Sequence, residues 1–108
     1  MLFRSGDTPR AVLFDGTSIW VSNNVDGTVS KIDPTTDAVV ATVSVGSGPN
    51  GMAFDGTNVW VTNSGSASIS KIDPTSATVV DTYSVGIAPI AAAYDGRNLW
   101  VEIGRAHV

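Results

Sequence analysis

The chain has 108 residues, 43% of them hydrophobic and 15% charged, with a formal net charge of −4, and this composition predicts a small globular unit with a core. The six Lys and Arg residues form no cluster, so no nucleic-acid partner is expected, and no run approaches the ~20 apolar residues of a membrane-spanning helix. The absence of Cys excludes disulfides and thiolate chemistry.

A forty-residue repeat begins at Gly6. Residues 6–45 and 46–85 are identical at 20 of 40 aligned positions. The run "FDGTSIWVSN" at Phe14 returns as "FDGTNVWVTN" at Phe54 and as "YDGRNLWV" at Tyr94. The repeat therefore predicts two complete units, 6–45 and 46–85, and a partial third unit, 86–101.

Each unit contains four short runs of β character separated by turn residues. The Asp55-Gly56 pair predicts a tight hairpin turn. Pro74 predicts another turn, because Pro cannot continue a central strand. In the second unit the expected strands are Met52–Asp55, Val59–Asn63, Ser68–Asp73 and Val79–Val85. Short connections between such strands predict an antiparallel meander, and hence an all-β fold.

Four strands in a period of about 40 residues are typical of a β-propeller blade. A β-solenoid is the competing repeat architecture, but parallel β-solenoids usually have shorter repeats. Helical repeats need a 3.6-residue apolar period, which this sequence lacks. The predicted fold is a β-propeller fragment of four-stranded antiparallel blades, about two and a half in number. Because a propeller has about four to eight blades, we expect the remaining blades of a parent propeller as partners.

The motifs "WVSN" at Trp20 and "WVTN" at Trp60, within the wider frame "FDGTNVWVTN…SISKIDPTSATVV", resemble the YVTN family of β-propeller repeats. Trp replaces the Tyr of that family in both copies, and the resemblance covers nearly all of residues 6–101. It implies a propeller fold. It implies little about function, because such propellers serve as surface-layer modules, binding platforms and occasionally enzymes.

Both ends of the chain depart from the repeat. Residues 1–5, "MLFRS", match neither of the segments one and two repeats further along the chain, residues 41–45 and 81–85. After Val101 the expected small polar residue and Asn are replaced by Glu102 and Ile103. Residues 1–5 and 102–108 resemble the two translated reverse-complementary strands of a sequencing adapter, so we expect both to be adapter-derived and excluded from fold reasoning. Glu102 and His107, the one Glu and the one His, are therefore not interpreted as an active site.

Three sets of repeated residues suggest chemistry but have simpler structural interpretations. The Trp residues at one repeat position suggest an aromatic cage, yet packing between blades is the favoured interpretation. The Asp residues before each hairpin Gly suggest calcium ligands, yet a lone Asp there is typical of a turn. A solvated strand face is favoured for the two Lys residues. These sets are Trp20, Trp60 and Trp100; Asp15, Asp55 and Asp95; and Lys31 and Lys71.

Positions that differ between units are better candidates for a binding surface, because scaffold residues repeat whereas ligand contacts do not have to. Arg10, Asn50 and Ile90 are equivalent and follow Pro residues, in segments expected to be loops that cross between blades near the central channel. Arg10 and Asn50 are therefore candidate ligand-surface residues, and the alternative interpretation is that they are variable loop residues that face water. No catalytic, cofactor-binding or metal-binding residue is predicted.

Two functions are compatible with the sequence. The first is a binding or interaction scaffold in a larger cell-surface or exported protein, with an unknown protein or small-molecule ligand. The many Ser, Thr, Asn and Asp residues, with no Cys and no Lys cluster, are compatible with this extracytoplasmic setting. The alternative is a fragment of a propeller enzyme resembling the streptogramin lyases, with its catalytic residues outside residues 6–101.

Overall fold

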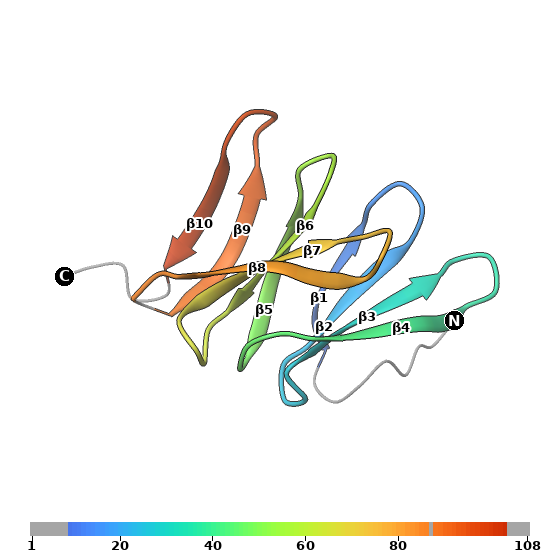
Figure 1. Ribbon diagram of the computed structural model, residues 1–108, viewed down its shortest axis with the longest axis horizontal. Helices are drawn as coiled ribbons and strands as arrows, with labels where there is room; N and C mark the ends of the chain where they lie inside the picture. The colour runs from blue at the N-terminus through green and yellow to red at the C-terminus, as the bar shows by residue number, and fades with distance from the viewer. Residues whose placement is uncertain (1–8, 87, 104–108) are drawn as a thin grey trace.

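A computed structural model of the chain describes residues 9–86 and 88–103, whose regular secondary structure consists of ten β-strands (Figure 1). Within these ranges no helix is long and apolar enough to cross a membrane. The predicted adapter-derived residues 1–5 and most of 102–108, including His107, lie outside the described residues. Strand β10 nevertheless continues through Glu102 and Ile103, beyond the predicted end of the repeat at Val101.

The strands form two four-stranded sheets and one two-stranded sheet, and every neighbouring pair is antiparallel. Blade 1 contains β1 (Pro9–Phe14), β2 (Ile19–Asn23), β3 (Thr28–Asp33) and β4 (Ala38–Ser44). Blade 2 contains β5 (Pro49–Phe54), β6 (Val59–Asn63), β7 (Ser68–Asp73) and β8 (Thr78–Ser84). Partial blade 3 contains β9 (Pro89–Tyr94) and β10 (Leu99–Ile103).

The predicted strands of blade 2 agree with β6 and β7 at both ends and are shifted by one residue at β8. The first strand was predicted too short: β5 begins at Pro49 rather than Met52. A register irregularity between Pro49 and Met52 explains the difference, because Pro is tolerated at the first position of a strand or at a bulge.

The blades stack face to face with their first strands innermost. β5 contacts both β1 and β9, whereas the last strands β4 and β8 contact each other little (Figure 1). The approach of β9 to β5 depends on Gly51, because a Cβ atom there would lie 2.6 Å from the Cα atom of Ala91. The blades therefore converge along one side and diverge along the other, as radially arranged sheets do.

The core lies between blades 1 and 2, not within either sheet. Side chains of one face of blade 1 pack against the opposing face of blade 2. Each fully buried Val or Ile among them contributes ~1.5–3 kcal/mol relative to an exposed position. The core residues are Trp20, Val29 and Val43 from blade 1 and Met52, Val59, Val61 and Ile72 from blade 2.

The three equivalent Trp residues differ in exposure according to what covers them. Trp20 is 0% exposed beneath the complete blade 2, Trp60 is half-buried beside the two strands of partial blade 3, and Trp100 is 61% exposed. The interpretation of the repeated Trp as a packing residue between blades is confirmed for Trp20. Trp100 is exposed because none of the described strands packs against its face of blade 3.

Candidate functional site

The repeated Asp residues shape the hairpin at one end of each blade. In blade 1, Asp15 Oδ1 accepts hydrogen bonds from the backbone N–H groups of Thr17 (2.8 Å) and Ser18 (2.7 Å), and Oδ2 accepts one from the Trp20 indole (2.8 Å). Asp55 and Asp95 make the equivalent three bonds. The predicted turn role is confirmed, and the described residues contain no acidic or His cluster that could hold a metal ion.

These hydrogen bonds also set the charge state of the turn. Partial burial alone raises the pKa of Asp15, but the bonds from Ser18, Trp20 and Thr17, together with the charge of Lys31, outweigh burial and lower that pKa below 3.8. The pKa of Asp55 is lowered by the corresponding groups. Both carboxylates are therefore ionised at neutral pH and act as fixed acceptors.

The hydroxyl in the "WVSN" and "WVTN" motifs satisfies backbone groups at the bulge of the innermost strand. Ser22 Oγ accepts a hydrogen bond from the Ala11 N–H (3.0 Å) and donates one to the Asn50 carbonyl of the next blade (2.8 Å). Thr62 Oγ1 accepts from the Gly51 N–H (2.8 Å) in the same way. The motif hydroxyl is thus a scaffold group.

The Asn of the same motif is buried and joins neighbouring strands. Asn23 Nδ2 donates to Ser30 Oγ at 3.0 Å, and Asn63 Nδ2 donates to Ser70 Oγ at 2.9 Å. Both Asn side chains are 0% exposed, so their amides bind strand β3 or β7 instead of a ligand. The residues that define the motif therefore stabilise the blade.

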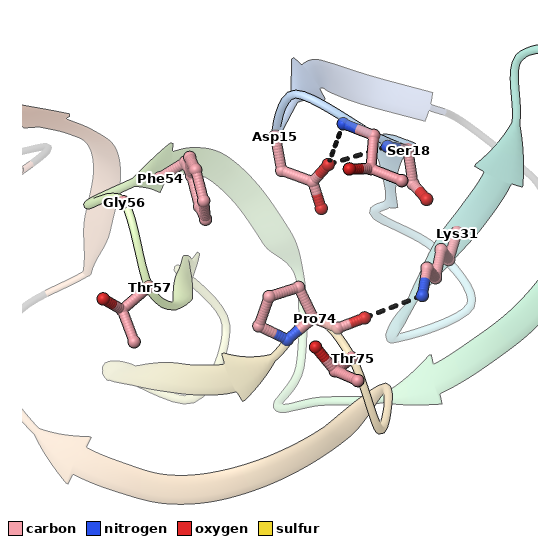
Figure 2. Close-up of a pocket in the computed structure, with 9 residues that line it drawn as sticks. Asp15, Ser18, Lys31, Phe54, Gly56, Thr57, Pro74 and Thr75 are labelled. Carbon is pink, nitrogen blue, oxygen red and sulfur yellow. Dashed lines mark hydrogen bonds between the residues drawn. The ribbon is translucent and has the colours of Figure 1, made fainter.

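A polar cleft of about 490 Å³ opens between blades 1 and 2 at the hairpin end (Figure 2). Its walls come from the β1–β2 turn, strand β3, the end of strand β5, the β5–β6 turn and the β7–β8 turn, so both blades are needed to form it. The lining residues are Asp15, Thr17, Ser18, Lys31, Phe54, Gly56, Thr57, Pro74 and Thr75.

Lys31 spans this cleft. Its Nζ atom donates a 2.7 Å hydrogen bond to the Pro74 carbonyl of blade 2 (Figure 2). The same atom lies 5.7 Å from the centre of the Trp20 ring. The favoured interpretation of Lys31 as part of a solvated strand face is therefore wrong, because the side chain joins two blades. Lys71 lies over Trp60 in the same manner, at 5.4 Å.

Arg10 and Asn50, the predicted ligand-surface residues, lie at the end of the blades opposite to the cleft. The prediction that they occupy loops is wrong: Arg10 is in β1, Asn50 is in β5 and their equivalent Ile90 is in β9. Arg10 is exposed and Asn50 is half-buried. Both therefore lie on neighbouring innermost strands, on the side where the blades converge.

Sequence reasoning missed the cleft. The recurrence of Lys31 and Lys71 before "IDP" was a signal, because a cation retained at a repeat position suggests a contact between repeats.

Glu102 stands at the position of the motif hydroxyls and is exposed, so the partial blade lacks that hydroxyl on β10.

No protein-family model matches the chain, and a search of curated proteins finds no significant match. Solved structures do match. The chain superposes on hydrazine synthase from Kuenenia stuttgartiensis with a TM-score of 0.83 and 25% identity over 94% of its length. It superposes on the β-propeller domain of Myceliophteria thermophila Cps50 (Swd1) with a TM-score of 0.79 and 16% identity, and on glutaminyl cyclase from Myxococcus xanthus with a TM-score of 0.69 and 14% identity, again over 94%.

These neighbours and the stacked antiparallel sheets define the class: the chain has the fold of a partial β-propeller of about two and a half blades. The predicted fold is confirmed. The chain spans only 31%, 34% and 53% of the three neighbouring chains. At 16% and 14% identity, the similarity to the second and third neighbours is evidence for the fold alone.

Proposed function

We propose that the chain is a section, residues 6–101, of a larger β-propeller that acts as a binding or interaction scaffold in a cell-surface or exported protein. Under this proposal further blades cover the Trp100 face. The exposure of Trp100 supports it, because the equivalent Trp20 is fully buried by the next blade.

The binding role is supported chiefly by the division between repeated and variable residues. The repeated Asp, Trp, Ser/Thr and Asn side chains hold the turns, the bulges and the strands. The variable residues Arg10 and Asn50 are on the innermost strands, where they are exposed or half-buried. A ligand contact is free to vary between blades, whereas a scaffold contact has to recur.

The chemistry of these two residues suggests the kind of ligand. Arg10 presents a guanidinium, which binds carboxylates through paired N–H donors, and Asn50 presents an amide with both donors and an acceptor. The combination favours an acidic peptide or another ligand bearing carboxylates. We therefore propose the innermost-strand surface around Arg10 and Asn50 as the ligand surface, with no catalytic step.

An array of acidic and neutral peptides, incubated with the fluorescently labelled chain, tests this proposal. Peptides that bind are retested with the double variant Arg10→Ala/Asn50→Ala and with Thr36→Ala, an exposed turn residue at the opposite end of blade 1. The proposal predicts at least a ~10-fold loss for the double variant and no loss for the control, as expected for a lost charge-assisted contact. Absence of binding peptides, or binding unaffected by the double variant, contradicts it.

A further inference from the structure

Two exposed apolar surfaces lie at opposite ends of the stack of blades. The first, on β1, contains Val12 (72% exposed) and Phe14 (60% exposed), and we call it the head face. The second, on β9 and β10, contains Trp100 beside Ala91 and Ala93, and we call it the tail face. Exposure of three large apolar side chains at such levels indicates surfaces that bind another protein.

The two faces are the repeat equivalents of surfaces that are already buried against each other inside the chain. Val12 and Phe14 stand at the positions of Met52 and Phe54, which pack with the core around Trp20. Trp100 stands at the position of Trp20 itself. On the head face, Val21 (5% exposed) and Ile32 (0% exposed) are already buried, so the part of this face that is open to a tail face is the β1 edge with Val12 and Phe14.

The tail face is also hollowed. A groove of about 240 Å³ lies along it, with mostly apolar walls formed by Ala91, Ala92, Ala93, Trp100, Val101 and Glu102. The small side chains of β9 leave room beside the Trp100 indole. A protruding aliphatic or aromatic side chain, as on the head face, matches this hollow in shape and polarity.

We propose that a second copy of this chain docks head to tail, with its Val12 and Phe14 against Trp100 and the groove. The inference rests on the proposed function, because the second copy takes the place that the proposal gives to further blades. Each chain supplies three blade positions, so two chains supply six, within the usual range of about four to eight for a closed ring. A head-to-tail interface of this kind closes into a ring when the rotation per chain permits it.

The association is predicted to respond to salt. Each chain carries a net charge of −4, so two copies repel each other, and added salt screens that repulsion while leaving apolar packing intact. The dimer is therefore expected to be favoured at higher ionic strength. An interface held by ion pairs behaves in the opposite way.

Size-exclusion chromatography with light scattering, over a series of protein concentrations, measures the association. The wild-type chain is expected to move from 11.1 kDa to twice that mass as its concentration rises. Phe14→Ser and Trp100→Ser are each expected to weaken dimerisation by ~30-fold, the effect of losing a hot-spot side chain. Val25→Ser, an exposed apolar residue on a loop, serves as the matched control and leaves dimerisation unchanged.

Mixing the two variants separates a head-to-tail interface from any symmetric one. The Phe14→Ser chain keeps an intact tail face and the Trp100→Ser chain keeps an intact head face, so an equimolar mixture is expected to recover association through one interface. Far-UV circular dichroism verifies folding, and Val12→Thr, which keeps the β-branched shape, provides a second head-face variant.

A monomeric wild-type chain at every concentration, or a dimer that Phe14→Ser leaves intact, overturns the inference. A mixture of the two variants that fails to associate, although both variants are folded, also overturns the inference. None of these results bears on peptide binding through Arg10 and Asn50, so failure of this inference is distinguishable from failure of the proposed function.

Discussion

Replacing Trp20 by Phe tests whether the core between the blades stabilises the chain. Trp20 is fully buried, and its indole N–H donates to Asp15 Oδ2 at 2.8 Å. Loss of a hydrogen bond to a charged group costs ~1.5–3 kcal/mol, and the lower end applies because Asp15 is only partly buried. Removing roughly 40 Å² of buried ring adds ~1 kcal/mol. Trp20→Phe is therefore expected to lower the free energy of unfolding by ~2–3 kcal/mol.

Trp100→Phe is the matched control, since it removes the same indole and the same type of hydrogen bond at an exposed position. Its effect on the free energy of unfolding is expected to be much smaller. Urea unfolding followed by far-UV circular dichroism measures both variants, at a concentration at which the wild-type chain is monomeric. Equal effects of the two substitutions, or no effect of Trp20→Phe, would refute the reasoning that blade 2 buries Trp20.

Three further predictions concern the backbone, the packing of β9 and the turns. Ala67 has a positive φ of 51°, whereas its equivalent Gly27 has a φ of 70°, so Ala67→Gly is expected to raise the free energy of unfolding by ~0.5–1 kcal/mol and Gly27→Ala to lower it by about as much, as measured by urea unfolding. If both substitutions change stability in the same direction, the backbone argument is wrong. Gly51→Ala places a methyl group against the backbone of β9, so faster amide hydrogen exchange is expected in β9 and β10 but not in β3; unchanged exchange contradicts the close approach. The lowered pKa values of Asp15 and Asp55 mean that the stability they provide is complete above their unfolded-state pKa of about 3.8 and is lost as the pH falls through their folded-state values. A fall in stability confined to pH below about 4 is expected for the wild-type chain, with a smaller fall for Asp15→Asn; the same profile in both proteins argues against the turn carboxylate as its source.

Local signals in the sequence were sufficient to predict the strands and turns within a blade. The Asp55-Gly56 pair located the hairpin, and Val59–Asn63 and Ser68–Asp73 were predicted at their observed ends. These features depend on residues close together in the sequence: turn chemistry and β-propensity act within a few positions. The repeat then extended each local prediction to the next blade.

Features that depend on contacts between blades were not predictable in the same way. The bulge between Pro49 and Met52 depends on the neighbouring strand, where the Thr62 hydroxyl accepts a hydrogen bond from the Gly51 N–H. Lys31 reaches the Pro74 carbonyl, which is 43 residues away in the sequence. Arg10 and Asn50 occupy a position that differs between the repeats, but their placement in strands depends on the bulges near the start of β1 and β5. The cleft between blades 1 and 2 likewise exists only once the two sheets are stacked.

The measurement that tests the central claim most directly is a set of nuclear Overhauser effects between the blades. The claim is that consecutive repeats stack face to face with the Trp20 indole enclosed between them. Cross-peaks are predicted from the Trp20 ring protons to the methyl groups of core residues in blade 2, namely Met52, Val59, Val61 and Ile72. If the Trp20 ring shows cross-peaks only to residues 9–44, the repeats do not stack and the propeller account is contradicted.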